Sequence, residues 1–229
     1  MEHVALIPAR AGSKSIINKN LIRLDGMETI TEKAVKLAKT SRIFKKIILS
    51  SDIEYFLDSD NSIWDDVVRH ERPDKLCTDS ALMKDVVKDA IESCKVEEDA
   101  WVWLLQPTTP FRKLKDFRQI KKKLDASGCH SVISLRDVEE THPSRMYTIH
   151  GDKAFPLKRG NFHNKQDLNP VFIRNGAFYV FKAKDFLTKD SFFIEPCHGH
   201  VMPYQRSVNI DGPMDLYIAK NIIEKRLVI

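Results

Sequence analysis

The stretch from His3 to Asn20, HVALIPARAGSKSIINKN, decides the fold class of this chain. Its beginning is almost wholly apolar and predicts a buried β-strand over 3–9. The residues that follow (10–20) contain three cations, one glycine and several hydroxyl or amide side chains. A loop of this kind directly after a strand can present cations and free backbone N–H groups to an anion. An ordinary solvated basic loop has the same composition, so both interpretations stand at this point.

Helical and strand patterns alternate along the chain after this loop. Apolar residues at helical spacing predict helices, and short apolar runs predict strands. We expect helices over 28–40, 81–94 and 114–124, and strands over 46–50, 101–105 and 131–135. Such alternation requires crossover connections, and it therefore predicts an α/β fold with a mostly parallel sheet.

The pattern changes between residues 136 and 169, which are polar, rich in His and Lys, and only weakly periodic. We expect a small inserted subdomain and assembly surface here, within a single domain that spans 1–229. Regular structure resumes with a strand over 176–181 and a last helix that starts near Pro213. Pro213 suits the first helical position, and Asp215 suits the first turn.

Composition excludes several classes of protein. Charged residues make up 30% of the chain and hydrophobic residues 42%, so a sizeable core can be buried. The net charge of +5 is evenly spread, which argues against nucleic acid as a partner and suits substrates that carry phosphates. No apolar run is long enough to cross a bilayer, so no membrane partner is expected. The four cysteines lack CxxC spacing, which indicates reduced thiols in a cytoplasm.

Polar residues also follow the other predicted strands, where an open parallel sheet binds its ligands. The triplet at 50–52, SSD, ends the second strand, and QPTTPFR (106–112) follows the third. Two prolines stiffen the latter loop and present Gln106 at the end of its strand. Thr109 and Pro110 also fit the start of a helix, and both interpretations can hold together.

Two short segments could hold a metal ion. Asn209 and Asp211 carry oxygen atoms at positions i and i+2 of an extended segment, which suits Mg²⁺ bridged to phosphates. An Asp before a Gly-Pro helix start is also a common turn residue. The run CHGH at 197–200 has three possible ligands without a second cluster nearby. A chance strand edge is therefore favoured there over a metal-binding regulatory domain.

Six segments, in order and over nearly the whole chain, resemble the acylneuraminate cytidylyltransferases, the CMP-sialic acid synthetases and their relatives for other nonulosonic acids. They are IPARAGSKSIINKNL (7–21), SSD (50–52), RPDKLCTDSA (72–81), LLQPTTPFR (104–112), NGAFYV (175–180) and NIDGPMDL (209–216). The resemblance implies a Rossmann-like, three-layer nucleotidyltransferase in which 136–169 reaches into the partner subunit of a homodimer. It also implies transfer of CMP from CTP to the C2 hydroxyl of a nonulosonic acid, with release of pyrophosphate and with Mg²⁺ or Mn²⁺ as cofactor.

The same resemblance implies roles for individual residues. The catalytic set is Arg10, Lys19 and Asp211. The nucleotide would be bound by Arg10, Ser13, Lys14, Lys19, Asn20, Arg72 on the cytosine, and the backbone near Ala81. The sugar would be bound by Gln106, Lys165, Asn175, Tyr179, Phe192 and Phe193. The metal would be held by Asp211 and Asn209.

The chain also departs from the family pattern. Asn209 stands where the family has a first metal-site aspartate, and Lys165 stands where many members have an arginine that pairs with the sugar carboxylate. Ala11 and Ser15 replace loop glycines, which restricts the dihedral angles of the loop. Two alternatives stay open. One is a KDO cytidylyltransferase, which the KNL end of the first loop disfavours. The other is a catalytically impaired nucleotide-binding homologue, which Asn209 and the altered loop motivate.

Overall fold

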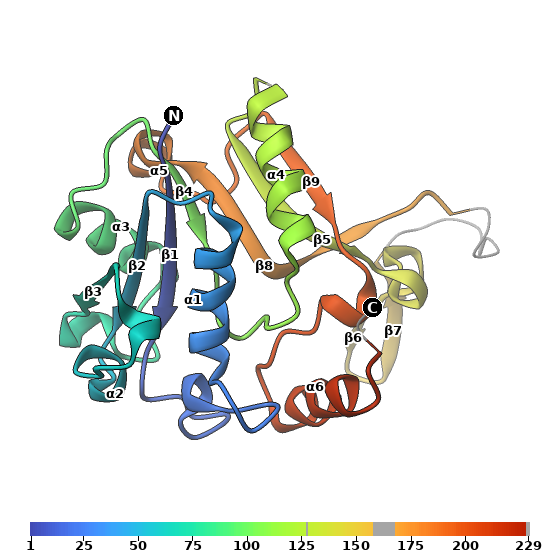
Figure 1. The fold of residues 1–229 in the computed structure, drawn as a ribbon. Helices are drawn as coiled ribbons and strands as arrows, with labels where there is room; N and C mark the ends of the chain where they lie inside the picture. The colour runs from blue at the N-terminus through green and yellow to red at the C-terminus, as the bar shows by residue number, and fades with distance from the viewer. Residues whose placement is uncertain (127, 158–167, 228–229) are drawn as a thin grey trace.

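The computed structural model describes residues 1–126, 128–157 and 168–227. Within these ranges, seven strands form one sheet in the order β3-β2-β1-β4-β8-β5-β9 (Figure 1). The strands are β1 (His3–Ala9), β2 (Lys46–Ser51), β3 (Val67–Glu71), β4 (Trp101–Leu104), β5 (Ser131–Asp137), β8 (Phe172–Lys182) and β9 (Cys197–Val201). Strand β8 runs antiparallel to both of its neighbours, and the other neighbouring pairs are parallel. The predicted α/β fold with a mostly parallel sheet is confirmed.

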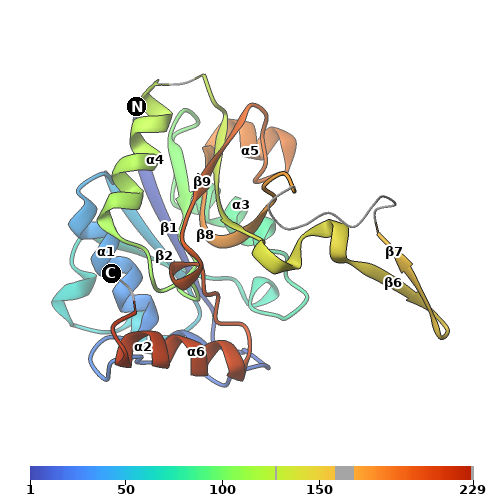
Figure 2. The same cartoon turned by 90° about the vertical axis from the view of Figure 1, so that its right-hand side faces the viewer.

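Helices cover both faces of this sheet (Figures 1 and 2). Helices α1 (Ile30–Ser41) and α4 (Leu114–Ala126) lie on one face, and α3 (Met83–Ser93) and α5 (Ala183–Lys189) lie on the other. Ala5 and Ile7 of β1 pack towards the first pair, whereas Val4 and Leu6 pack towards the second. Successive side chains of a strand point to opposite faces, so a strand that is apolar throughout is covered on both sides. None of the helices in the described ranges is long and apolar enough to cross a membrane.

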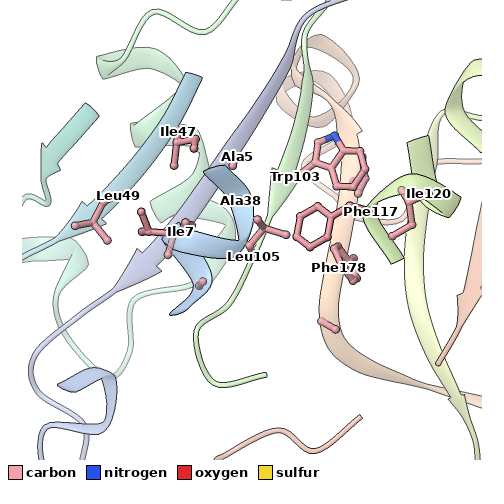
Figure 3. Packing of buried hydrophobic residues seen from close by; sticks show 14 of the residues in the cluster. Ala5, Ile7, Ala38, Ile47, Leu49, Trp103, Leu105, Phe117, Ile120 and Phe178 are labelled. Carbon is pink, nitrogen blue, oxygen red and sulfur yellow. The ribbon is translucent and has the colours of Figure 1, made fainter. Parts of the chain in front are cut away.

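Aromatic side chains join β4, α4 and β8 in the core (Figure 3). The Trp103 and Phe117 rings stack with centroids 5.9 Å apart, and Phe178 meets the Phe117 ring edge-on at 5.0 Å. Aromatic pairs of this kind contribute about 0.5–1.5 kcal/mol each beyond the area that they bury. These contacts hold the antiparallel strand β8 beside β4 and so set the position of the polar residues at the ends of both strands.

Helix α1 begins later than the sequence pattern predicts because Thr29 caps it. The Thr29 hydroxyl accepts a hydrogen bond from the Glu32 N–H at 3.0 Å, and the Thr29 N–H donates to the Glu32 carboxylate at 2.6 Å. This reciprocal pair ends the preceding extended segment. The last predicted helix is α6 (Pro213–Glu224), which packs through Ala219 and Ile222 on a third apolar cluster beside the site.

Several elements are not predicted from the sequence pattern. Strands β3 and β9 lie at the two edges of the sheet, where VVRHE and CHGHV bury few side chains, so neither has an apolar period. Strand β8 starts four residues before the predicted strand, in an exposed section that extends beyond the core. The short helices α2 (Glu54–Leu57) and α5 were also not predicted.

The polar insertion contains a two-stranded hairpin that protrudes from the body of the molecule (Figure 2). Its strands are β6 (Tyr147–His150) and β7 (Lys153–Pro156). All residues of both strands are exposed, including the apolar side chains of Tyr147, Ile149 and Phe155. An isolated hairpin of two strands is at best marginally stable in water.

Candidate active site

Two adjoining cavities open at the edge of the sheet where β1, β2 and β4 end. The first, of about 370 Å³, is lined by Arg10, Lys19 and Arg72 among others. The second, of about 620 Å³, is lined mainly by residues of β8 and of the segment before α6. Met83, Gln106 and Asn209 line both cavities. The placement agrees with the rule that open parallel sheets bind ligands beyond the carboxyl ends of their strands.

The loop after β1 is held in shape by side chains from neighbouring segments. The Ala11 N–H donates to the Asp52 carboxylate at 2.8 Å, which ties the loop to the end of β2. The Asn20 amide donates to the Arg10 carbonyl at 2.8 Å, and the Thr31 hydroxyl donates to the Asn20 carbonyl at 2.9 Å. These bonds define the start and end of the loop, so it keeps a fixed shape with a Cβ atom at Ala11 instead of a glycine.

The cations of this loop have different surroundings. Arg10 and Lys19 line the first cavity, together with Ser13 and Asn20. The Lys19 side chain is only 13% exposed, and its ammonium lies 3.5 Å from the Asp211 carboxylate. Lys14 is 87% exposed and does not line the cavity. The loop therefore directs two of its three cations towards the same space.

Arg72 lies at the back of the first cavity, where it is almost wholly buried. Its Nε donates to the Ser50 hydroxyl at 3.2 Å, and its Nη2 donates to the Ser50 carbonyl at 2.8 Å. Burial lowers the pKa of this guanidinium. The Ala81 N–H is bonded to the Thr78 carbonyl at 3.3 Å, and Ala81 does not line either cavity. Met83, at the start of α3, lines both cavities.

Gln106 reaches the boundary between the two cavities because of a glycine on the neighbouring strand. Gly176 has a φ of +76°, which residues other than glycine rarely adopt, and a Cβ atom there would lie 3.2 Å from the Gln106 Oε1. The buried Arg112 holds the same loop, since its guanidinium donates to the Gln106 carbonyl, the Thr109 hydroxyl and the Ala177 carbonyl. Burial lowers the pKa of Arg112 to about 9. Arg112 is thus a structural cation beneath Gln106.

The second cavity contains some of the residues that the resemblance assigned to the sugar. Asn175, Tyr179 and Phe192 line it, whereas the exposed Phe193 does not. The Asn175 amide donates to the Ser207 hydroxyl at 2.9 Å and accepts from the Ala177 N–H at 3.1 Å, so internal bonds fix its orientation. Lys165 lies outside the described residues.

Several residues of the second cavity were not among the predicted site residues, including two arginines and a tyrosine. Arg136, Arg174 and Tyr204 line it, and the Arg136 guanidinium lies over the Tyr204 ring at 5.1 Å from the centroid. A signal for Arg136 was present, because it directly follows the predicted strand 131–135, as Gln106 follows its own. Arg174 precedes the NGAFYV segment without any comparable signal.

Asn209 and Asp211 lie side by side, as their spacing predicts. The Asn209 amide nitrogen donates to the Asp211 Oδ2 at 2.5 Å, and the backbone between them is tied to the Thr108 carbonyl at 2.8 Å. The Asn209 Oδ1 is buried and accepts no hydrogen bond from any residue that the structure describes, while the Asp211 side chain is 69% exposed. One exposed carboxylate and one unpartnered amide oxygen suit a hard cation that obtains its remaining ligands from phosphates and water.

The CHGH run forms β9 and gathers no set of metal ligands. His200 is buried and bonded to Asp116 at 3.2 Å, and Arg206 contacts the same carboxylate. Hydrogen bonds from His200 and Arg206 hold the pKa of Asp116 down to about 2, against the opposing effect of its burial. Across the described ranges, no group of three or more His, Cys, Asp or Glu residues is placed to hold a metal ion.

Sequence comparison identifies several proteins that this chain resembles. It is 29% identical over 216 residues to the N-acylneuraminate cytidylyltransferase of Streptococcus agalactiae serotype V, a match that covers 92% of this chain and 51% of the relative. It is 29% identical over 230 residues to the CMP-N,N'-diacetyllegionaminic acid synthase of Legionella pneumophila, and this match covers 98% of this chain and 97% of the relative. The pseudaminic acid cytidylyltransferase of Campylobacter jejuni is 26% identical, with 96% and 95% covered. The chain thus spans about half the length of the streptococcal relative and nearly all of the other two.

Solved structures share the fold. The CMP:2-keto-3-deoxy-manno-octonic acid synthetase complexed with CTP superposes with a TM-score of 0.67 at 13% identity, over 99% of this chain and 100% of that one. A 4-diphosphocytidyl-2C-methyl-D-erythritol synthase gives a TM-score of 0.64 at 12% identity, over 97% and 98%. Comparison with protein families matches residues 4–189 to the family described as Cytidylyltransferase. These residues include the loop after β1, the Arg72 segment and the loop after β4, and the chain therefore belongs to the cytidylyltransferase family.

Proposed function

We propose that this chain transfers CMP from CTP to the C2 hydroxyl of a nonulosonic acid and releases pyrophosphate. The observation that carries the proposal is the pair of adjoining cavities, one lined by cations and the other by polar and aromatic side chains, with Gln106 and Asn209 at their boundary. A nucleotide in the first cavity and a sugar acid in the second would bring the two reactants together there. The names of the sequence relatives refer to N-acylneuraminate, N,N'-diacetyllegionaminic acid and pseudaminic acid, which supports this substrate class.

In the proposed reaction, the C2 oxygen bonds to the α-phosphorus of CTP, and the bond from this phosphorus to the oxygen that bridges to the β-phosphate breaks. Pyrophosphate leaves with the electron pair, and the hydroxyl proton passes to the exposed Asp211 carboxylate. Arg10 and Lys19 stabilise the charge on the triphosphate and on the departing pyrophosphate. Phosphoryl transfer of this kind depends on charge stabilisation and alignment more than on covalent catalysis.

The other residues of the first cavity would bind the nucleotide. The Ser13 hydroxyl and the Asn20 side chain, whose amide nitrogen also holds the Arg10 carbonyl, would make polar contacts with the nucleotide beside the two cations. The Nε and Nη2 of Arg72 donate hydrogen bonds to Ser50, so Nη1 would donate to an acceptor atom of cytosine. Lys14 and the backbone near Ala81 lie further out, and we expect them to contribute after the nucleotide has bound.

The second cavity would bind the sugar acid. Gln106 at the boundary would contact the sugar near its reacting carbon, and Asn175 would do so from β8. Tyr179 and Phe192, whose rings lie 5.4 Å apart, offer an apolar surface to the acyl or glycerol portion. The exposed Phe193 would join this surface only in the bound state. Lys165, which the resemblance places on the sugar side, lies outside the described residues.

A divalent cation, Mg²⁺ or Mn²⁺, is part of this proposal. The Asp211 carboxylate and the unpartnered Asn209 Oδ1 would hold it, with phosphate oxygens completing the set. Mg²⁺ commonly binds in this way, through one or two side chains plus substrate phosphates. When bound, it supplies additional neutralisation of the charge on the triphosphate.

We further propose that two copies of the chain form a homodimer through the insertion at 136–169. The hairpin of β6 and β7 supports this arrangement, because it exposes Tyr147, Ile149 and Phe155 on a two-stranded element that has little stability of its own. Size-exclusion chromatography with light scattering tests it. A monomer at all concentrations would contradict it.

A panel of sugar acids with CTP, scored by pyrophosphate release, tests the proposed reaction. The panel contains N-acetylneuraminic, N,N'-diacetyllegionaminic and pseudaminic acids, and 2-keto-3-deoxy-manno-octonic acid. Release with one of the first three supports the proposal. Release with the octonic acid alone identifies the KDO-type alternative. CTP binding without release for any sugar identifies an impaired homologue.

A further inference from the structure

Two arginines of the second cavity have no role in the proposal so far. Arg136 lies in β5 and Arg174 in the antiparallel neighbour β8, where Arg136 pairs with Ile173 and Leu135 pairs with Arg174. The two arginines are therefore offset by one position at the same end of the sheet. Residues offset by one position project from opposite faces of a ladder, so the lining of the cavity, and not the strand register, places both side chains at the site. Both line the cavity, and neither forms an ion pair within the part of the chain that the structure describes.

The position of Arg136 is restricted before any ligand binds. Its guanidinium lies over the Tyr204 ring at 5.1 Å from the centroid, and its Nη1 donates to the Asp137 carbonyl at 3.0 Å. An arginine held in this way loses less conformational freedom when it binds a ligand, and its remaining N–H donors stay available.

The charge of the cavity favours an anion. Asp215 is the acidic residue among those that line it, and its carboxylate accepts hydrogen bonds from the N–H groups of Asp211 and Gly212 at 3.0 and 2.8 Å. The Asp215 carboxylate thus caps the start of α6. Two guanidinium groups remain without a counter-charge among the described residues of the cavity.

We infer that Arg136 and Arg174 recognise the carboxylate of the sugar acid. This inference rests on the proposed function, in which every substrate of the class carries a carboxylate on the carbon that also bears the reacting hydroxyl. Guanidinium groups bind carboxylates through paired N–H donors, so they fix the direction of the carboxylate as well as its position. Holding this group orients the neighbouring hydroxyl. The family resemblance assigns the carboxylate to Lys165 instead, and the two assignments predict different results.

The first test measures steady-state kinetics of Arg136→Gln and Arg174→Gln with CTP and the most active sugar of the panel. The KM for the sugar should rise about 10- to 100-fold, the loss typical of a hydrogen bond to a charged group, while the KM for CTP stays within about two-fold. Arg174→Lys keeps the charge without the paired donors and should give an intermediate KM; it also serves as the informative variant if Arg174→Gln does not fold. Arg118→Gln makes the same charge change on the outer surface of α4, away from both cavities, and should behave as the wild type.

The second test compares that sugar with its C1 carboxamide, which has the same shape without the charge. The wild type should prefer the acid, and the two glutamine variants should lose most of this preference, whereas a general loosening of the cavity would weaken both ligands equally. An undiminished preference for the acid in both variants, or a loss confined to Lys165→Gln, would overturn the assignment while the proposed function stands. A wild type that releases pyrophosphate with no sugar of the panel would overturn the proposed function and this assignment with it.

Discussion

The Arg10 guanidinium lies 2.5 Å from one carboxylate oxygen of Asp79, and the Lys14 ammonium lies 2.9 Å from the other. One carboxylate thus bridges two cations of the loop that we propose binds the triphosphate. Hydrogen bonds from Lys14 and Arg10 lower the pKa of Asp79, so this group is charged at neutral pH. A phosphate that approaches Arg10 has to compete with it.

Replacing Asp79 should therefore tighten nucleotide binding. We expect Asp79→Asn to lower the Kd for CTP about two- to five-fold, in keeping with the modest strength of exposed ion pairs. Isothermal titration with CTP measures this effect. Asp74→Asn changes an exposed carboxylate of the same segment that makes no ion pair with the loop, and its Kd should match the wild type. Weaker binding by Asp79→Asn would indicate that Asp79 orients Arg10 for the nucleotide.

Lys19 should matter for turnover more than for folding. We expect Lys19→Ala to lower kcat about 100- to 1000-fold, because the charge that develops on pyrophosphate loses a positioned cation. The thermal unfolding temperature should stay close to that of the wild type. Lys36→Ala removes an exposed lysine of α1 that pairs with Glu28, and it should leave kcat unchanged. A Lys19→Ala enzyme with near-normal turnover would refute the role of this side chain.

Asn209 offers a direct test of the metal site. Asn209→Asp places a second carboxylate beside Asp211, and we expect the Mg²⁺ concentration for half-maximal activity to fall about three- to ten-fold, since added ligand charge strengthens binding of hard cations. The comparison variant Asn221→Asp adds the same charge on α6, outside both cavities. If the Mg²⁺ titration of Asn209→Asp matches that of the wild type, the cation binds elsewhere.

Gly176 couples backbone conformation to the position of Gln106. An alanine there would adopt a φ of +76° with its Cβ 3.2 Å from the Gln106 Oε1. We expect Gly176→Ala to lower the free energy of unfolding by about 1–2 kcal/mol and also to reduce kcat/KM for the sugar. Gly151→Ala carries a similar φ of +58° with nothing within 4 Å. It should lose stability while keeping activity, and equal loss of activity in both variants would rule out the specific contact with Gln106.

His3 should make stability depend on pH. Burial lowers its pKa from 6.5 to about 4, and its Nδ1 accepts a hydrogen bond from the Trp103 indole at 3.1 Å. In the unfolded chain, His3 becomes protonated as the pH falls below 6.5, whereas in the folded protein it stays neutral until about pH 4. The stabilisation is therefore complete above pH 6.5 and is lost as the pH falls towards 4, by about 3 kcal/mol in total.

Urea unfolding between about pH 7 and pH 4 checks this expectation. His3→Gln keeps an acceptor for Trp103 without the titrating ring, so its free energy of unfolding should fall less steeply over this range than that of the wild type. His150→Gln, on the exposed hairpin, should follow the wild-type curve. Parallel curves for the wild type and His3→Gln would show that another group causes the loss.

The fold was largely predictable because its central elements have strong local patterns. Strand β1 is apolar throughout since helices cover both faces of the sheet, and α3 buries the stripe that its spacing predicts, with Val86 and Ile91 among its members. The edge strands β3 and β9 were not predicted, because an edge strand buries too few side chains to produce a period. Arg10 and Gln106 of the first cavity were predictable for a related reason, since they follow central strands, whereas Arg72 follows the edge strand β3.

By itself, the sequence determined the layers of the fold, the cationic loop after the first strand and the proximity of Asn209 to Asp211, because each depends on residues that are close in the chain. Only the tertiary structure decided that Asp79 meets Arg10, that Gly176 makes room for Gln106, and that Arg136 and Arg174 share a cavity. Those relationships join segments that are distant in sequence. Asp79 and Arg10 lie in segments after β3 and β1, whereas the other two relationships depend on the packing of β8 against β4 and β5. No local pattern of residues encodes such a contact.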